Sequence, residues 1–408
     1  MSAIHQVMET QSQASGLMIE GGQRQLELAK HLLKIWSNLQ TCFNKQKHLG
    51  GVVTRVRMLR TIHPVGQGGF ASEYFTDAKS TFVYDCGSLS PLGSQIEKEK
   101  FVDASLMGGD VDCLFISHFD EDHVSLIPAL KARRKIKRVV IPLVDKVSKN
   151  LVKTLFDSSE LAEFLLNPEE AFGEDVSVYR VEPFSQDGVD MMEPLAFESE
   201  VGGRVQSGQT WRVQGEDWEY AFFNVRSEKR IREFNEMCSK LSMPIDTTKL
   251  DDIGYVLDHK KELKQIYKRM EGGINQNSLL VYSGPSQRNG LADQAPSLID
   301  CYWPFHRASG CFYTGDYDCT DLPLVIRSLG MRKDLIGTIQ IPHHGSKKSW
   351  DDGLVLNSGR RYFIQCGSKN IYGHPAMSVI QSVYEKDPCA CVSVVQEFAS
   401  KAIVQRIV

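Results

Sequence analysis

Long apolar runs are missing from this 408-residue chain, which has no stretch of 18 apolar residues to form a membrane-spanning helix. The N-terminus also lacks a basic segment followed by an apolar one, as a secretory signal would have. The ten cysteines form no CxxC pair, and they stand singly or inside apolar runs. This usage is typical of free thiols in a reducing compartment. We therefore expect a soluble, cytoplasmic protein with no membrane partner.

A strong excess of one charge is also absent, because the formal net charge is only −4. This value argues against indiscriminate nucleic-acid binding and leaves room only for a local basic groove. The densest basic segment spans residues 131–138. It is either a solvated helix end or a tract that contacts phosphates. Apolar residues make up 42% of the chain, enough for a sizeable buried core.

The first 50 residues stand apart from the rest. They contain an apolar stripe at steps of four, three, four and four, and Gly50-Gly51 follows it. This spacing predicts a helical extension over 1–50. The extension would pack on its own domain, pair with a second copy or bind another protein. The stripe consists of Leu28, Leu32, Ile35, Leu39 and Phe43.

Short strand-like segments separated by helices or loops fill the remaining chain and predict a layered α/β domain over 51–408. The sequence pattern changes at about 145–274, where charged helical segments flank one β-like segment. We expect this part to be a mixed insertion. The strand-like segments lie at 52–62, 81–84, 111–117, 139–143, 278–283, 310–314, 337–341, 362–366 and 391–395.

Acids and histidines follow three of these strands. Carboxylates and imidazoles that converge from separate strands are typical of a metal site, because a bound dication offsets the repulsion among the acids. The pattern predicts two divalent ions that share Asp316 and a bridging hydroxide. The expected metal ligands are His118, Asp120, Asp122, His123, Asp316 and His344.

The chain resembles the metallo-β-lactamase fold superfamily, and most closely its branch with the ComEC-type hydrolase domain and the phosphorylcholine esterases. The resemblance covers about 52–145 and 275–400. It implies a four-layer αββα sandwich with two metals at one edge. The matching blocks are Val65-Gly66-Gln67-Gly68, Asp85-Cys86-Gly87, Ser117 to His123, Tyr313 to Asp316, Pro342 to Ser346, Asn370 to Pro375, and Asn275 to Leu279.

Three positions depart from that branch. Gly69 replaces an acid, and Asp120 stands where most of the superfamily has histidine. The histidine expected in the middle of the domain has no counterpart, and Asn275 and Ser278 occupy that region. An oxygen ligand in place of nitrogen makes manganese more competitive with zinc, so we expect either zinc or manganese as the cofactor.

The remaining site residues receive roles from their chemistry and their place in the motifs. We expect Asp122, Asp316, His343 and His374 to act in catalysis, with His343 stabilising developing negative charge; the roles of His343 and His344 could be exchanged. His374 would meet the leaving group or pack at a helix start. Expected substrate-binding residues are Ser346, Lys347, Asn275 and Asn370.

The resemblance implies a metal-dependent phosphodiesterase, and most specifically a nuclease. The alternatives are a hydrolase of a small phosphodiester, such as a nucleotide messenger or a phosphorylcholine group, and a partner-bound subunit with reduced or no activity. The substrate would accordingly be nucleic acid or a small phosphodiester. A protein partner or a second copy would bind through the N-terminal helix.

Overall fold

The computed structural model describes residues 56–155, 159–184, 195–196, 202–270, 277–287, 308–356, 358–397 and 402–407. The expected helical extension over 1–50 and the candidate substrate-binding residue Asn275 lie outside these residues.

The first sheet has eight strands, and its central strands are almost continuously buried. From β3 to β8 the strands run parallel, whereas β16, β1, β2 and β3 are antiparallel neighbours. Their order is β16 (Ile403–Ile407), β1 (Met58–Ile62), β2 (Phe70–Phe75), β3 (Ser80–Cys86), β4 (Cys113–Phe115), β5 (Arg138–Pro142), β6 (Ser177–Val181) and β8 (Gly203–Val205).

The second sheet also has eight strands. The four strands from β15 to β12 are parallel, and β12, β11, β10 and β9 are antiparallel neighbours. Their order is β15 (Cys391–Val395), β14 (Arg361–Gln365), β13 (Ile336–Gln340), β12 (Gly310–Tyr313), β11 (Asn277–Gly284), β10 (Glu219–Arg226), β9 (Thr210–Arg212) and β7 (Leu195–Ala196).

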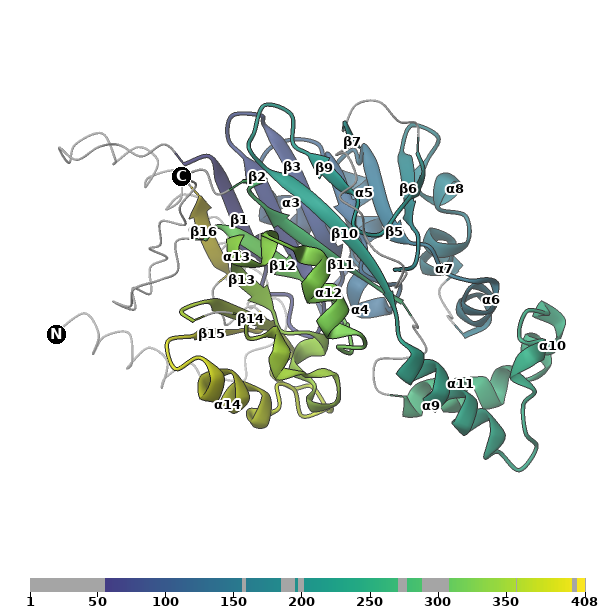
Figure 1. The fold of residues 1–408 in the computed structure, drawn as a ribbon. Helices are drawn as coiled ribbons and strands as arrows, with labels where there is room; N and C mark the ends of the chain where they lie inside the picture. The colour runs from purple at the N-terminus through teal and green to yellow at the C-terminus, as the bar shows by residue number, and fades with distance from the viewer. Residues whose placement is uncertain are drawn as a thin grey trace, which may run out of the picture. The chain divides into compact units, whose positions relative to one another are not determined.

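The two sheets pack face to face through a core rich in aromatic rings. Tyr84 of the first sheet stacks on Tyr313 of the second with ring centroids 4.7 Å apart. Helices cover the outer faces: α3 (Gln95–Ser105) packs on the first sheet, and α12 (Leu322–Leu329) and α14 (Met377–Lys386) pack on the second (Figure 1). The expected αββα sandwich is confirmed.

A separate helical cluster joins α6 (Lys146–Leu155) to α9 (Glu228–Ser239), α10 (Ile253–Asp258) and α11 (Lys260–Arg269) through their own apolar contacts. The region expected to be an insertion, 145–274, contains this cluster and also the strands β6 to β10, which belong to both sheets. The other helices are α4 (Glu121–Val124), α5 (Ile127–Arg133), α7 (Ser159–Leu166), α8 (Pro168–Phe172) and α13 (Arg332–Leu335).

None of the helices in the described ranges combines the length and the apolar character needed to cross a bilayer. The cysteines of these ranges are all free thiols.

Candidate metal centre

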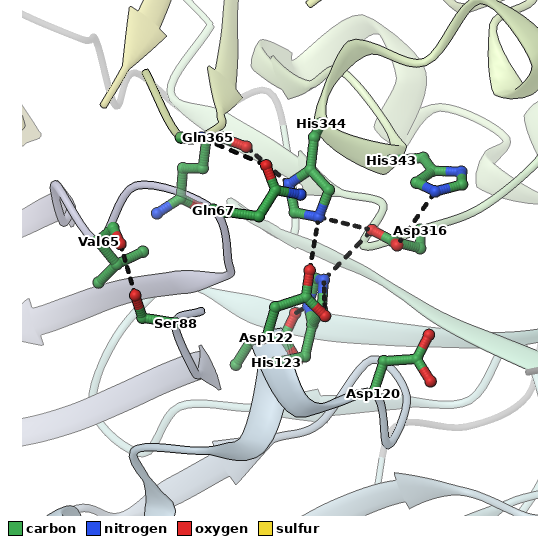
Figure 2. Close-up of polar contacts among 12 residues, drawn as sticks. Val65, Gln67, Ser88, Asp120, Asp122, His123, Asp316, His343, His344 and Gln365 are labelled. Carbon is green, nitrogen blue, oxygen red and sulfur yellow. Dashed lines mark hydrogen bonds and ion pairs between the residues drawn. The ribbon is translucent and has the colours of Figure 1, made fainter. Parts of the chain in front are cut away.

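Side chains from both sheets converge at the carboxyl ends of their strands (Figure 2). His118 follows β4, and Asp122 and His123 belong to the short helix α4. Asp316 and the His343-His344 pair follow the adjacent parallel strands β12 and β13. The loops after β12 and β13 are joined by a hydrogen bond from the His343 backbone N to the Gly315 carbonyl oxygen, 2.9 Å long.

Asp316 lies at the middle of the converging groups. Its Oδ1 is 3.2 Å from His123 Nε2 and 3.7 Å from His344 Nε2. Its Oδ2 is 3.7 Å from the Nε2 atoms of both His118 and His343. Asp122 Oδ2 adds a 3.0 Å contact with His344 Nε2 (Figure 2). Two carboxylates, one from α4 and one from the loop after β12, therefore face four imidazoles.

Each of the four rings is held from behind through Nδ1. His118 Nδ1 lies 2.8 Å from Ser117 Oγ, and His123 Nδ1 lies 2.8 Å from Asp85 Oδ2. This arrangement leaves every Nε2 directed toward the carboxylates, as in histidines that ligate metals. The other two contacts are His343 Nδ1 to Ser349 Oγ and His344 Nδ1 to the Gln365 carbonyl oxygen, both 2.7 Å.

Three inward atoms are buried without a hydrogen-bond partner: His118 Nε2, His123 Nε2 and Asp316 Oδ1. These atoms make ion-pair contacts, such as the 3.2 Å contact between His123 Nε2 and Asp316 Oδ1, but no hydrogen bond of regular geometry, and a cation between them would satisfy them better. Their ligand atoms form one compact group, and Asp122, His123 and His344 form a second group. His123 belongs to both groups, but its single inward nitrogen, Nε2, can bind only one ion. If two ions bind, His123 is therefore a ligand of only one of them. The donor set of imidazoles and carboxylates suits a divalent metal.

Asp120 is placed differently from the other candidate ligands. It is the N-cap residue of α4, and its Oδ2 lies 3.6 Å from His118 Nε2. Its carboxylate stands apart from the Asp122 and Asp316 carboxylates in Figure 2, and it belongs to neither compact group. A histidine at this position would add a nitrogen ligand, whereas the shorter aspartate stays at the edge of the centre.

Burial and mutual charge shift the pKa values of these groups in opposite directions. Burial, reinforced by the charges of Asp122 and Asp316, raises the pKa of Asp120 to about 8. Burial opposes ionisation of Asp122 as well, but the His123 and His344 imidazoles outweigh it and lower its pKa to about 2. Burial lowers the pKa of His343 to about 4. A dication here would favour every carboxylate in its charged form and every ligating imidazole in its neutral form.

The close approach of α4 to the end of β3 depends on glycine. A Cβ atom on Gly87 would lie 2.4 Å from both the Asp122 carbonyl oxygen and the His123 carbonyl carbon. At Gly69, where the related branch has an acid, a Cβ atom would lie 2.7 Å from His123 Nδ1. Both positions therefore leave room for the backbone and the ring of the ligand segment.

The expected substrate-binding residues lie in two loops. Ser346 is buried and its Oγ accepts a hydrogen bond from the Lys348 backbone N, while Lys347 is exposed. The Asn370 amide bonds to the backbone of its own loop, donating to the Gly367 and His374 carbonyl oxygens and accepting from the His374 backbone N. Its amide thus shapes the loop that carries His374. The His374 ring lies 5.8 Å from the His343 ring.

Sequence reasoning missed several residues that support the centre. Asp85 belongs to the block Asp85-Cys86-Gly87, which by itself indicates no role for it. In the structure it accepts a hydrogen bond from the Ser117 backbone N and contacts His123. Ser349 has no motif signal. Arg230 of α9 is buried, and its Nη2 donates to the Asp316 carbonyl oxygen over 2.6 Å. Position 230 lies in a charged helix far from the motifs, so only the folded chain reveals its role.

Acidic and aromatic partners occupy much of the basic segment 131–138. Arg134 binds Asp103 over 2.8 Å, and Lys137 binds Asp112 over 2.9 Å. Lys131 lies over the rings of Phe164 and Phe172. These contacts favour the structural interpretation of the segment over a tract for phosphates.

The sequence profile of the metallo-β-lactamase superfamily matches residues 71–206. No curated protein sequence matches the chain. Among solved structures, the chain is similar to the short form of human tRNase Z, with 10% identity and a TM-score of 0.37 over 85% of this chain and 98% of that one. Zn²⁺-bound PqqB from Methylobacterium extorquens is 10% identical, with a TM-score of 0.39 over 85% and 99% of the two chains. A metallo-β-lactamase superfamily protein from Sulfolobus tokodaii is 13% identical, with a TM-score of 0.27 over 70% and 79%.

The matched region contains most of the first sheet and the segment from Ser117 to His123, which supplies half of the converging side chains. Most of the second sheet and the other three converging side chains, Asp316, His343 and His344, lie outside the matched residues. The chain thus matches the metallo-β-lactamase superfamily over residues 71–206, and its described strands form the two-sheet sandwich expected from that resemblance.

Proposed function

We propose that this protein is a metal-dependent phosphodiesterase, and that its substrates include nucleic acid or nucleotides. The observation that carries the proposal is the convergence of four imidazole Nε2 atoms on the Asp122 and Asp316 carboxylates, three of the inward atoms being buried without a partner. Divalent metal held by His118, Asp122, His123, Asp316 and His344 would supply Lewis acidity and make water more acidic.

The chain's own groups would then orient the substrate. His343 lies next to Asp316 but outside both compact groups of ligand atoms. If Ser349 Oγ donates to His343 Nδ1, the Nε2 atom carries the proton and can donate a hydrogen bond to a phosphoryl oxygen. His374, whose ring centroid is 5.8 Å from that of His343, would hold a proton for the leaving oxygen. The two adjacent histidines would thus have different roles: His344 binds the metal, and His343 donates a hydrogen bond to the substrate.

The test compares wild-type protein with Asp122→Asn on single-stranded DNA, RNA, cyclic dinucleotides and bis(4-nitrophenyl) phosphate, with zinc or manganese added. We expect wild type to hydrolyse at least one of these phosphodiesters, and Asp122→Asn to lose about 100-fold or more in kcat/KM, because the metal loses a charged ligand. Asp110→Asn, at an exposed aspartate outside the centre, is the matched control and should behave as wild type. Equal turnover by Asp122→Asn, or hydrolysis of none of the phosphodiesters, would refute the proposal.

A further inference from the structure

Exposed apolar side chains gather in the loop that follows β14. Ten large hydrophobic residues are exposed among the described residues, and three of them lie within 371–377. Ile371 is 90% exposed, Tyr372 is 57% exposed and Met377 is 72% exposed. Scattered apolar side chains are ordinary at a surface; these three, two in the loop and one at the first residue of α14, are concentrated in one place, as at many binding surfaces.

This loop is continuous with the candidate metal centre. The Tyr372 ring stacks near-parallel to the His374 ring, with centroids 5.9 Å apart and an angle of 19° between the planes. His374 in turn lies 5.8 Å from His343, whose Nε2 is 3.7 Å from Asp316 Oδ2. A chain of three neighbouring rings therefore leads from the central carboxylate to the exposed face of Tyr372.

The loop is also held in place before any ligand arrives. The Asn370 side chain makes three hydrogen bonds to its backbone, between 2.6 and 2.9 Å long. The Ala376 backbone N donates to the Gly345 carbonyl oxygen over 3.0 Å, which fixes the loop to the turn that bears His344. A surface that is ordered in advance loses little conformational entropy when it binds a rigid ring.

A second aromatic residue interacts electrostatically with the same groups. Tyr267 of α11 feels the charges of Asp120 and Asp122, which together with burial raise the pKa of its hydroxyl group, and Tyr372 contributes to the same shift. Tyr267 and Tyr372 come from segments more than 100 residues apart, and both lie within electrostatic reach of the centre. Aromatic side chains at the edge of a phosphodiester site are suited to stacking on nucleobases.

We propose that Ile371 and Tyr372 form a stacking platform for the nucleobase next to the scissile phosphodiester, which makes nucleotide-containing phosphodiesters the preferred substrate class. This inference rests on the proposed function of the neighbouring centre. Phosphodiesters without an aromatic base would reach the metal ligands, but the platform would add nothing to their affinity. Selection between the two classes would therefore depend on Tyr372 and not on the metal ligands.

The test is equilibrium binding by titration calorimetry on the full chain with zinc or manganese present. The probes are adenosine 5′-monophosphate and ribose 5-phosphate, which share the phosphate and the sugar but differ in the base. Wild type should bind the adenosine compound about tenfold more tightly, as expected for one base stacked on one aromatic side chain. Tyr372→Leu should remove this difference, while Tyr372→Phe should retain it because the ring is kept.

Tyr384→Leu is the matched control, since Tyr384 is an exposed tyrosine of α14, 42% accessible, and should leave the difference intact. The platform is overturned if wild type binds both probes equally, or if Tyr372→Leu still prefers the base. Loss of the preference in Tyr372→Leu supports the platform even where no phosphodiester is hydrolysed, and in that case only the proposed function fails. Activity with no base preference would instead leave the function standing and refute the platform.

Discussion

In each of the four histidines of the centre, the partner of Nδ1 sets the orientation of the ring and the atom that Nε2 faces. A carboxylate, two hydroxyls and a backbone carbonyl hold the four Nδ1 atoms of the centre. The ligand residues themselves could be predicted, because each follows a buried strand in a short motif. Their partners could not: Ser349 and the Gln365 carbonyl oxygen reach the rings only after the loops fold, and a carbonyl oxygen is offered by every residue type.

His63 provides a pH test that does not involve the metal centre. Its ring is buried, with Nε2 2.8 Å from Ser72 Oγ, and burial lowers its pKa from 6.5 to about 3. The unfolded chain therefore takes up this proton first as the pH falls. We expect the contribution of His63 to the free energy of unfolding to be complete above pH 6.5 and to decline toward pH 3, by at most about 1.4 kcal/mol per pH unit.

Denaturant unfolding at pH 7, 6 and 5 measures this decline, and His63→Gln is the comparison because glutamine does not titrate. The variant should lose less stability than wild type between pH 7 and 5. Parallel decline in both proteins would show that His63 does not contribute in this way, since the remaining histidines are common to both.

At the level of elements, the positions of the strands could be predicted more easily than which strands pair with each other. The strand-like segments after 277 correspond to β11 to β15 because each is a short, buried, apolar run. The region 145–274 was expected to be an insertion, yet its β10 pairs with β11 along eight residues, from Glu219 opposite Gly284 to Arg226 opposite Asn277. Pairing between segments so far apart leaves no local pattern. The position of α9 could not be predicted for the same reason. Hydrogen bonds from Ser227 and Arg230 join it to the loop after β12, through Asp318 and Asp316.

The contact between β3 and α4 gives a test of how closely these elements must approach. Replacing Gly87 by alanine would force its Cβ against the backbone of Asp122 and His123, so α4 must move away. We expect Gly87→Ala to destabilise the fold by about 1–3 kcal/mol. Because the candidate ligands Asp122 and His123 move with α4, the metal affinity of the variant should also fall.

Thermal unfolding and metal titration of Gly87→Ala measure both effects. Gly109→Ala is the matched control, because no atom lies within 4 Å of the position its Cβ would take. Wild-type stability together with wild-type metal affinity in Gly87→Ala would contradict the packing argument.

The molecule as a whole combines a buried polar network between its sheets with the candidate metal centre at one edge. Within the sandwich, Glu73 accepts hydrogen bonds from Arg60, Tyr220, Ser283 and Tyr313, which come from both sheets. A buried carboxylate with this many donors is compensated without a metal. Asp316 differs, because its carboxylate oxygens face the imidazoles of four histidines within 4 Å and not hydroxyl or guanidinium donors. Its charge is balanced either by protonated imidazoles or by a cation, and the proposed function requires the cation.

The most direct measurement is metal binding to the protein after bound metal has been removed. Zinc and manganese are titrated by calorimetry, and elemental analysis counts the bound ions. Wild type should bind at least one ion. Asp316→Asn should bind about tenfold or more weakly, because it replaces the charged oxygen ligand that lies among all four imidazoles. Asp110→Asn should bind as wild type does. A wild-type protein that binds neither metal, or an Asp316→Asn variant with unchanged affinity, would contradict the account of this cluster as a metal centre.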